Sequence, residues 1–577
     1  MRIDEYSAST ETHAHRHPFR YRGRLKVPLA VGSAALLAMS MLSQPAWAIS
    51  SVVDGGGDGG GVVVSDAAAA CPALSGATIP AAKIGLPTRG AVVTSATLKA
   101  ADPASGASEF CLVKGHVTSV DPSAPPVNFE VNLPTDWNRR TLQFGGGGFD
   151  GTVVTGMGIF GWGTAPGQAA PLDLGYVTFG SDGGASVGPN PPSSFALNPT
   201  AFSNYSGEAV KRTRDTAVAI TEQYYRHSPR YQYFAGGSKG GQEALTAAER
   251  YSDDYNGIIA YFPASQQALL WSAYHLQQVA YGTPGAYLDP AKQQLFGKAL
   301  FAACDTLDKA ADGVISNVSA CEKAFTFTAL RCPGGRDTGD TCLSDVQIAT
   351  LKSGQKPYKF DFPFPNGTTT LGGYPILAGG KLSPYWLDTT GKGTETIFNG
   401  LTMPAFNYWY QQRKTPPPAL DLSLDYRQYK DRIHSIGTEY DRNNPDMDQF
   451  VTHGGKLILV QGNADMLTPP NATNAYYKSV AARYGKKTQQ FMRYYTVPGY
   501  GHGEGVFNLA WDSVSALDSW VTKGTAPNHP IAYNGNSTTV QSRPLCRYPS
   551  WPKYNGHGNA NEANSFSCVT SRTENHL

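Results

Sequence analysis

The stretch YQYFAGGSKGGQEALTAAER, residues 231–250, carries the pattern that decides the fold. Aromatic and apolar residues at 231–235 are typical of a buried strand, and residues 242–250 are rich in strong helix formers. Between them lies the motif G-x-S-x-G with Ser238 at its centre, which predicts a sharp turn from strand to helix. Such a turn exposes the serine hydroxyl as a nucleophile and places the backbone N–H of Lys239 where it can face an oxyanion. The alternative, a glycine-rich turn with an incidental serine, is disfavoured by the flanking strand and helix.

A serine nucleophile needs a base, and the base needs a carboxylate that orients it. In chains with this type of turn, the acid and then the histidine follow on loops after later strands. The apolar run at 456–460 is followed by Asp465, and the run at 494–497 is followed by His502 in a glycine-rich loop. The sequence therefore predicts a triad of Ser238, Asp465 and His502, against the alternative of an ordinary loop histidine.

Acyl transfer also needs a second donor to the oxyanion, worth roughly 3 to 4 kcal/mol of transition-state stabilisation. Residues 144–151, FGGGGFDG, follow an early apolar run, as the oxyanion loop of many esterases does. We expect the donor to be a backbone N–H within 145–148, and we favour Gly146 or Gly147. The alternatives are a plain flexible turn or a phosphate cradle, but no G-K-[S/T] follows the glycines.

Strand-like and helical stretches alternate from about residue 110 to 261 and again from 456 to 522. This alternation predicts an α/β fold with a mainly parallel sheet and helices on both faces. The stretch 264–445 interrupts the rhythm with four cysteines and many aromatic residues. We expect one core, built from residues 71–263 and 446–577, that carries residues 264–445 as a large inserted lid domain.

The N-terminal region has the composition of an export signal. Basic residues precede an apolar run at 27–42, and Ala46-Trp47-Ala48 follows it, so residues 1–48 are predicted to be a signal peptide. A membrane anchor is the alternative, but the run is shorter than the roughly 20 residues that a span needs. Residues 49–70 are rich in Gly and Ala and predict a flexible tether. The protein is therefore expected to be secreted or periplasmic.

The charge balance limits the classes of binding partner, and the cysteines indicate disulfides. With 47 Lys and Arg against 45 Asp and Glu, the net charge of +2 gives no footprint for nucleic acid or an anionic membrane. A small-molecule or neutral-polymer partner is expected. The eight cysteines fall into an N-terminal pair, a central four and a C-terminal pair, which favours bridges between near neighbours. None lies in a C-x-x-C motif, so a zinc or redox site is not expected, nor is an organic cofactor.

Four segments carry a resemblance to a known family: 233–245 (YFAGGSKGGQEAL), 256–264 (NGIIAYFPA), 454–459 (GGKLIL) and 497–502 (VPGYGH). With them, the chain resembles the tannase and feruloyl esterase family of α/β-hydrolases, which includes hydrolases of mono(2-hydroxyethyl) terephthalate. The resemblance extends from about residue 71 to 568. It implies the α/β-hydrolase fold, the triad given above, and a lid inserted between the serine and acid strands.

The resemblance also implies a disulfide pattern, with one departure. The implied bridges are Cys71–Cys111, Cys304–Cys321, Cys332–Cys342 and Cys546–Cys568. Family members usually carry a further cysteine just before the nucleophile and another just after the histidine, bridged beneath the triad. Here these positions are Gly237 and Gly503, so we predict a more mobile His502 loop.

A cluster of acids in the lid indicates a cation site. Asp305, Asp308 and Asp312 lie within eight residues, and a hard cation would use such carboxylates together with backbone carbonyls. An EF-hand does not fit, because Ala310 and Ser319 occupy ligand positions of that motif. The resemblance implies a structural Ca²⁺ held by the three side chains and by the carbonyls of Ala310 and Val314. The alternative is a solvated acidic turn.

The predicted function is secreted hydrolysis of an ester of an aromatic acid, of feruloyl or galloyl type, through an acyl-enzyme. The runner-up within enzymes is hydrolysis of terephthalate-type monoesters on the same triad. Outside enzymes, it is an exported, calcium-stabilised binding protein with a vestigial triad. Arg413 and Lys414 are candidates to pair with a substrate carboxylate, although a solvated pair is the simpler interpretation. Aromatic lid residues are expected either to stack on the substrate or to form the lid core: Tyr374, Tyr385, Trp386, Phe398, Phe406, Tyr408, Trp409 and Tyr410. The sequence leaves the oligomeric state open.

Overall fold

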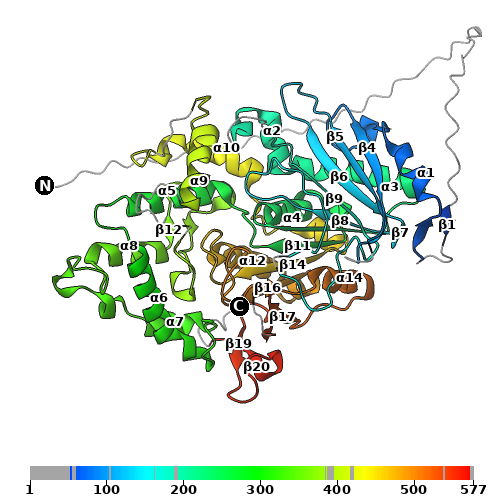
Figure 1. Cartoon of the computed structure of the whole chain (residues 1–577). Helices are drawn as coiled ribbons and strands as arrows, with labels where there is room; N and C mark the ends of the chain where they lie inside the picture. Colours follow the sequence, from blue (N-terminus) through cyan, green and yellow to red (C-terminus); the bar gives the residue numbers. More distant parts are fainter. Residues whose placement is uncertain are drawn as a thin grey trace, which may run out of the picture. The chain divides into compact units, whose positions relative to one another are not determined.

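A single ten-stranded sheet positions the rest of the molecule (Figure 1). The computed structural model describes residues 52–54, 60–102, 106–161, 163–186, 193–383, 385, 396–415, 421–536 and 540–571. The strands of the sheet are β3 (Thr78–Ile79), β4 (Ala91–Lys99), β5 (Phe110–Val117), β6 (Val127–Pro134), β8 (Arg140–Phe144), β9 (Val177–Ser181), β10 (Tyr231–Gly237), β11 (Gly257–Tyr261), β14 (Lys456–Gly462) and β15 (Met492–Val497). Their order is β15-β14-β11-β10-β8-β9-β6-β5-β4-β3.

The sheet is mixed, whereas the sequence predicted a mainly parallel one. From β15 to β9 every neighbouring pair is parallel. From β9 to β3 every pair is antiparallel. Strands β4 and β5 alternate between buried and more exposed residues, as expected for strands with one solvated face. The long antiparallel half therefore extends the α/β core and does not belong to its alternating strands and helices.

Helices cover both faces of the parallel half, as predicted. On one face lie α4 (Lys239–Arg250) and α12 (Pro470–Tyr484), and on the other lies α14 (Ser513–Lys523). Helix α3 (Ala209–Tyr225) packs mainly on the antiparallel strands. Neighbouring residues of a strand point to opposite faces, so Ile258 packs with the α4 cluster while Ile259 packs with the α14 cluster. This two-sided burial explains why β11 and β14 read as continuous apolar runs.

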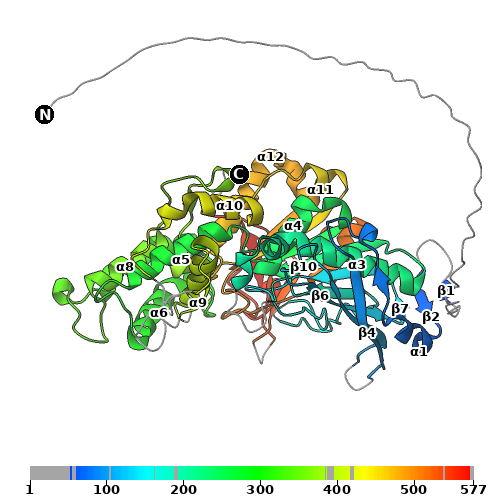
Figure 2. The ribbon, with the colours of Figure 1, turned by 90° about the horizontal axis from the view of Figure 1, so that it is seen from above.

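The predicted lid is mostly helical and lies to one side of the sheet in both views (Figures 1 and 2). Its helices are α5 (Gln267–Tyr281), α6 (Pro290–Cys304), α7 (Val318–Ala324), α8 (Asp345–Gln355), α9 (Ile397–Pro404) and α10 (Lys430–Tyr440). A π-helical turn follows α9 at Ala405–Tyr410. Two short strands, β12 (Tyr358–Lys359) and β13 (Thr370–Leu371), pair within it.

One hydrophobic cluster fills the lid and continues into the core. It includes Phe195 and Tyr205, which precede the nucleophile strand, together with residues of the lid helices. Of the eight lid aromatics considered above, seven are buried in this cluster, and Trp386 lies outside the described residues. The seven therefore form lid core rather than an open stacking surface.

The N-terminal tether prediction is wrong in part. Strand β2 (Val62–Val64) pairs antiparallel with β1 (Val52–Asp54) and with β7 (Asp136–Trp137), and the side chains of Val62 and Val64 are buried. The alanine run forms a short helix, α1 (Ala67–Ala70), capped by the side chain of Asp66. The predicted signal peptide lies outside the described residues. Within the described part of the chain, no helix has the length and apolar character needed to cross a membrane.

The four disulfides implied by the resemblance are present: Cys71–Cys111, Cys304–Cys321, Cys332–Cys342 and Cys546–Cys568. The disulfide Cys546–Cys568 links the segment before β19 (Trp551–Tyr554) to β20 (Phe566–Val569), and β20 pairs with β19. A further small sheet, β16 (Leu509–Ala510), β17 (Ile531–Asn534) and β18 (Ser542–Pro544), follows the histidine loop.

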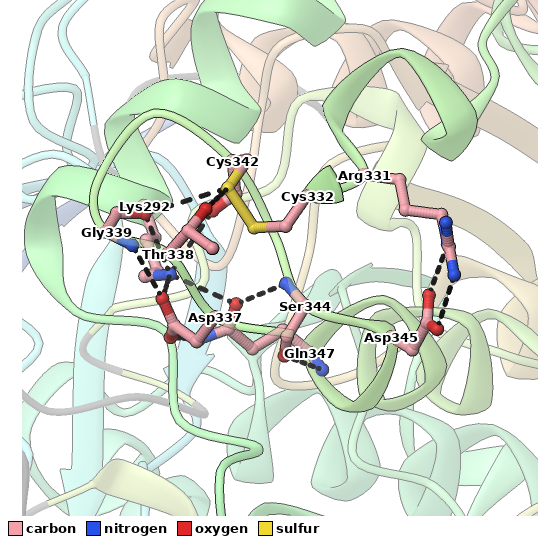
Figure 3. Close-up of a disulfide and its surroundings, with 10 residues drawn as sticks. All are labelled: Lys292, Arg331, Cys332, Asp337, Thr338, Gly339, Cys342, Ser344, Asp345 and Gln347. Atoms are coloured by element: carbon pink, nitrogen blue, oxygen red, sulfur yellow. Dashed lines mark hydrogen bonds and ion pairs between the residues drawn. A yellow bond between two sulfur atoms is a disulfide. The ribbon is translucent and has the colours of Figure 1, made fainter. Parts of the chain in front are cut away.

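Cys332–Cys342 closes a corner of the lid that is also held by a buried lysine (Figure 3). The ammonium of Lys292 on α6 donates to Asp337 at 2.8 Å, to the carbonyl of Cys342 at 3.2 Å and to Gln347 at 3.3 Å. These acceptors compensate for burying the charge. Gln347 and Ser344 also form the capping box that starts α8. The corner therefore combines a covalent link with a polar network.

Candidate active site

Ser238 lies in the turn between β10 and α4, as the motif predicted. Its φ of +59° is a left-handed conformation that non-glycine residues adopt at a cost, and it is typical of a nucleophile on a strained turn. The turn closes only because glycines flank it: a Cβ on Gly236 would lie 2.2 Å from the carbonyl oxygen of Gly240. The backbone thus holds the serine where strand and helix approach most closely.

His502 and Asp465 form the predicted pair, with 2.9 Å between Nδ1 of the imidazole and Oδ2 of the carboxylate. Asp465 follows β14, His502 follows β15, and the Asp465 side chain is fully buried. Because Nδ1 faces the carboxylate, the proton belongs on Nδ1 and Nε2 is left free to act as a base.

Neighbours of Asp465 fix its orientation. The carboxylate accepts hydrogen bonds from the backbone N–H of Leu467 at 2.8 Å and of Thr468 at 2.9 Å. It also accepts from the Thr468 hydroxyl at 2.7 Å and from the Gln461 amide at 3.1 Å. Sequence reasoning missed both Thr468 and Gln461. A hydroxyl three residues after a predicted acid is a signal that could have found Thr468, whereas nothing comparable marks Gln461.

Phe262 is another residue at the site whose contact with the histidine the sequence did not predict. Its ring packs against the imidazole of His502, with 4.4 Å between the ring centroids. Phe262 has a φ of +30°, and its carbonyl oxygen lies 3.2 Å from the oxygen of the Thr468 hydroxyl, whose proton is directed to Asp465. The imidazole is therefore held by Asp465 through one nitrogen and by Phe262 through a ring contact. Nothing in the local sequence pattern indicates this contact.

Ser238 and His502 line one cavity of about 370 Å³. Its other walls come from the glycine loop, from the nucleophile turn and from apolar residues of the core and lid. The lining is Gly146, Gly147, Gly148, Gly237, Lys239, Phe262, Ala264, Gln267, Leu270, Trp271, Tyr274, Ile397, Leu401, Leu467 and Thr468. The structure thus brings the predicted nucleophile, base and oxyanion loop to one mostly apolar cavity, with Asp465 behind the imidazole.

The three predicted oxyanion donors differ in how their N–H groups are placed. The N–H of Lys239 lies in the first turn of α4, at the positive end of the helix, as expected. The N–H of Gly146, however, donates to Oε2 of Glu243 at 2.8 Å, and the N–H of Gly147 donates to Oδ1 of Asp150 at 3.0 Å. Both glycine amides are bonded inside the protein, so neither is free to bind an oxyanion.

The predicted calcium loop has the charge for a cation but not its ligand geometry. Oδ2 of Asp308 is buried without a hydrogen-bond partner, and burial, with the charges of Asp312 and Asp305, raises the pKa of Asp308 to about 6. Such an oxygen suits a hard cation. Asp312, however, accepts a hydrogen bond from the guanidinium of Arg543 on β18. Among the described residues, no three His, Cys, Asp or Glu side chains are arranged to hold a metal.

The remaining candidates lie apart from the cavity or act through the backbone. Arg413 and Lys414 are exposed and do not line the cavity, so the solvated interpretation fits them. Gly237 is buried at the end of β10, and Gly503 has a φ of +80°, a conformation that glycine adopts without strain. The cysteines of the described chain are all paired elsewhere.

Comparison with known proteins identifies the family of the chain. Residues 111–569 match the family model described as tannase and feruloyl esterase. An uncharacterized esterase of Agrobacterium fabrum is 36% identical over 523 residues, which cover 87% of this chain and 93% of that protein. The mono(2-hydroxyethyl) terephthalate hydrolase of Piscinibacter sakaiensis is 26% identical, over 84% of this chain and 89% of its own.

A solved structure shows the same fold. The crystal structure of feruloyl esterase B from Aspergillus oryzae superposes with a TM-score of 0.71 and 22% sequence identity. The match covers 87% of this chain and 99% of that structure. The likeness therefore includes the lid as well as the sheet.

Proposed function

Because the chain belongs to the tannase and feruloyl esterase family and is a carboxylic ester hydrolase, we propose that it cleaves esters of aromatic acids through an acyl-enzyme on Ser238. The observation that carries this proposal is the His502–Asp465 pair, 2.9 Å apart, in the same cavity as a serine on a strained turn. A glycine-rich turn with an incidental serine would not explain why these three residues lie together.

The reaction runs in two halves. Nε2 of His502 takes the proton of the Ser238 hydroxyl as its oxygen bonds the ester carbon, and the resulting oxyanion accepts from the Lys239 N–H. The imidazolium, stabilised by Asp465, then gives the proton to the leaving alcohol oxygen, and the carbon–oxygen bond breaks. Water, deprotonated by His502, attacks the acyl carbon and releases the acid with Ser238 restored.

An aromatic acyl group is supported by the walls of the cavity. Trp271 and Tyr274 of α5 line it, together with Leu401 of α9. These side chains give an apolar wall, with the Trp271 and Tyr274 rings edge to face, against which an aromatic ring gains burial and ring contacts. A terephthalate-type monoester is the second candidate, because a relative of 26% identity carries that activity in its name.

Hydrolysis of p-nitrophenyl acetate by the wild type and by Ser238→Ala tests the chemistry. We expect activity in the wild type and its loss in the variant. An inactive wild type, or equal rates in both, would contradict the proposal and favour a binding protein. Among methyl gallate, methyl ferulate, chlorogenate and mono(2-hydroxyethyl) terephthalate, the ester with the highest kcat/KM then identifies the acyl group.

We also propose that the protein is exported. The four disulfides are of the kind that persists in an oxidising compartment, and residues 1–48 have the composition of a signal peptide. Mass spectrometry of the protein recovered from the medium or periplasm tests this, with an N-terminus near Ile49 as the expected result. Protein that remains in the cytoplasm with residues 1–48 attached would contradict it.

A further inference from the structure

Three ionisable side chains form a buried cluster behind the oxyanion loop, residues 145–151, and none of them has a role in the reaction above. The ammonium of Lys239 lies 2.8 Å from Oε1 of Glu243 and 3.4 Å from Oδ2 of Asp150. The side chains of Lys239 and Asp150 are each 1% exposed, and that of Glu243 is 8% exposed. The Nζ atom also lies 4.5 Å from the centre of the Tyr205 ring, a cation–π contact.

The two carboxyl groups of the cluster share one lysine. Burial raises the pKa of Asp150 well above its usual range, which the charge of Lys239 opposes and that of Glu243 reinforces. A paired, hydrogen-bonded arrangement of this kind is what a buried charge requires.

Both acids reach out of the cluster to the backbone of the loop. Glu243 accepts the N–H of Gly146, and Asp150 accepts the N–H of Gly147. On the other side, the carbonyl of Gly146 accepts the N–H of Gly240 in α4 at 3.1 Å. The peptide group between Gly145 and Gly146 is therefore held through its N–H. The peptide group between Gly146 and Gly147 is held through both its carbonyl and its N–H. Asp150 itself has a φ of +53°, a strained conformation that fixes the direction of its side chain.

Two amides of the described loop remain without an acceptor, those of Gly148 and Phe149, and of these two residues only Gly148 lines the cavity. The carbonyl of Gly147 accepts the N–H of Asp150 at 2.8 Å, closing a tight turn. Because the peptide is trans, the N–H of Gly148 points opposite to that carbonyl and out of the turn. Gly148 lines the cavity, and within the described chain its N–H has no hydrogen-bond acceptor. Its own carbonyl is held by the Tyr205 hydroxyl at 2.9 Å.

We propose that Asp150 and Glu243, with the Lys239 side chain as their counter-ion, are positioning residues that hold the oxyanion loop so that the Gly148 N–H is its second oxyanion donor. The proposal rests on the acyl-enzyme mechanism given above. Lys239 then serves twice: its backbone N–H binds the oxyanion, and its side chain anchors the loop that supplies the partner donor.

Substitutions that remove or keep the acceptor test the role of the acids. Asp150→Ala leaves the Gly147 N–H unbound, and we expect kcat/KM for p-nitrophenyl acetate to fall roughly 10- to 100-fold. The Ki of trifluoroacetophenone, whose serine adduct carries an oxyanion, should rise by the same factor. Asp150→Asn keeps an acceptor oxygen of the same reach for the Gly147 N–H, so it should recover activity to within about threefold of the wild type.

The chain offers a matched control in Asp215 on α3. This buried carboxylate also accepts a glycine N–H, from Gly85 at 2.8 Å, and also pairs with a lysine, Lys211. It does not line the cavity. Asp215→Ala should lower the melting temperature while leaving kcat/KM and the Ki unchanged. Glu243→Ala, which removes the acceptor of the Gly146 N–H, provides a second test should Asp150→Ala fail to fold.

Amide hydrogen exchange in the wild type, resolved to single residues, tests the assignment of the donor without any variant. The amides of Gly146 and Gly147 should be protected from exchange with and without trifluoroacetophenone. The amide of Gly148 should become protected only when the inhibitor is bound. Protection gained at Gly146 or Gly147 instead would overturn the proposal. So would wild-type kinetics in Asp150→Ala and Glu243→Ala, or a loss that Asp150→Asn does not recover. Such results in an active wild type leave the esterase function standing.

Discussion

The hydroxyl of Tyr385 in the lid donates a hydrogen bond of 2.8 Å to Glu504, two residues after His502. The catalytic loop is therefore tied to the lid from outside. The loop is also braced internally, because the N–H of Gly501 donates to the carbonyl of Glu504 at 2.6 Å. The loop has Gly503 next to His502, and among the described cysteines none is left to bridge it, so the lid contact is a restraint on this loop.

Tyr385→Phe should loosen the histidine loop. A hydrogen bond to a charged group is worth about 1.5 to 3 kcal/mol, and the partial exposure of Glu504 reduces this. We expect faster amide exchange over residues 499–506 and a several-fold lower kcat. Lys381→Met is the control: the Lys381–Glu504 pair spans 3.3 Å with side chains 57% and 42% exposed, so its loss should cost little. Unchanged exchange in Tyr385→Phe would show that the loop is held without the lid.

Asp465→Asn should inactivate the enzyme while leaving it folded. The amide cannot hold the proton on Nδ1, so the imidazole adopts the wrong tautomer, which costs about 10⁴-fold in kcat in serine proteases. Thr468→Val should cost less, because the carboxylate keeps its two backbone N–H donors and Gln461. Kinetics with p-nitrophenyl acetate measure both. A Thr468→Val loss as large as that of Asp465→Asn would mean that the hydroxyl, rather than the carboxylate, sets the tautomer.

Asp441, at the end of α10, should make the protein less stable as pH rises. Burial raises its pKa to about 7, partly opposed by the charge of Arg442. Between its unfolded pKa of about 3.9 and pH 7, the folded state holds a proton that the unfolded state has released, so the free energy of unfolding falls with pH. The slope from this group is at most about 1.4 kcal/mol per pH unit.

Asp441→Asn removes that contribution, because the amide is neutral at every pH. Urea unfolding at pH 5, 6 and 7 should therefore give a flatter or less negative slope for the variant than for the wild type. The exposed Asp431 on the same helix supplies the control variant, Asp431→Asn, which should follow the wild type. If the free energy of unfolding has the same slope against pH in Asp441→Asn and in the wild type, Asp441 is not the source of this pH dependence.

We propose that the loop of Asp305, Asp308 and Asp312 takes up Ca²⁺ once Arg543 moves from Asp312. Adding Ca²⁺ to EDTA-treated protein should then raise the melting temperature, and Asp308→Asn should abolish the effect. Asp340→Asn, which removes an exposed acid of the same lid, should not. If chelation changes neither the melting temperature nor the bound metal, Arg543 is itself the cation of this loop.

The triad could be predicted from the sequence because each of its members follows a local pattern. Ser238 lies in a strand–turn–helix motif, and Asp465 and His502 each follow an apolar run that forms a strand. The antiparallel half of the sheet could not be predicted in this way, because its strands are not separated by the helices that mark a parallel arrangement, and β6 pairs with β9 rather than with the next strand of the sheet in the chain, β8. Local periodicity does not contain that information.

The oxyanion loop shows the same limit at smaller scale. The glycines of 145–148 marked the right loop, but which amide is free depends on Glu243, a turn into α4, and on the side chain of Asp150. The former is distant in sequence, and the latter depends on an unusual backbone conformation. Likewise, Phe262 meets His502 only because β11 and β15 lie in one sheet. A pattern can identify the loop, whereas the donor is decided by tertiary contacts.

The hydrophobic cluster shared by the lid and residues 195–205 has a consequence for how such enzymes can change specificity. Tyr205 and Phe195 pack on Trp409 of the lid, and Tyr205 also holds the carbonyl of Gly148. A lid grafted from a relative would meet a foreign surface there and would disturb the catalytic loop through Tyr205. A lid exchanged into this chain should therefore be exchanged together with residues 195–205, so that Tyr205 keeps its contacts with both Trp409 and Gly148.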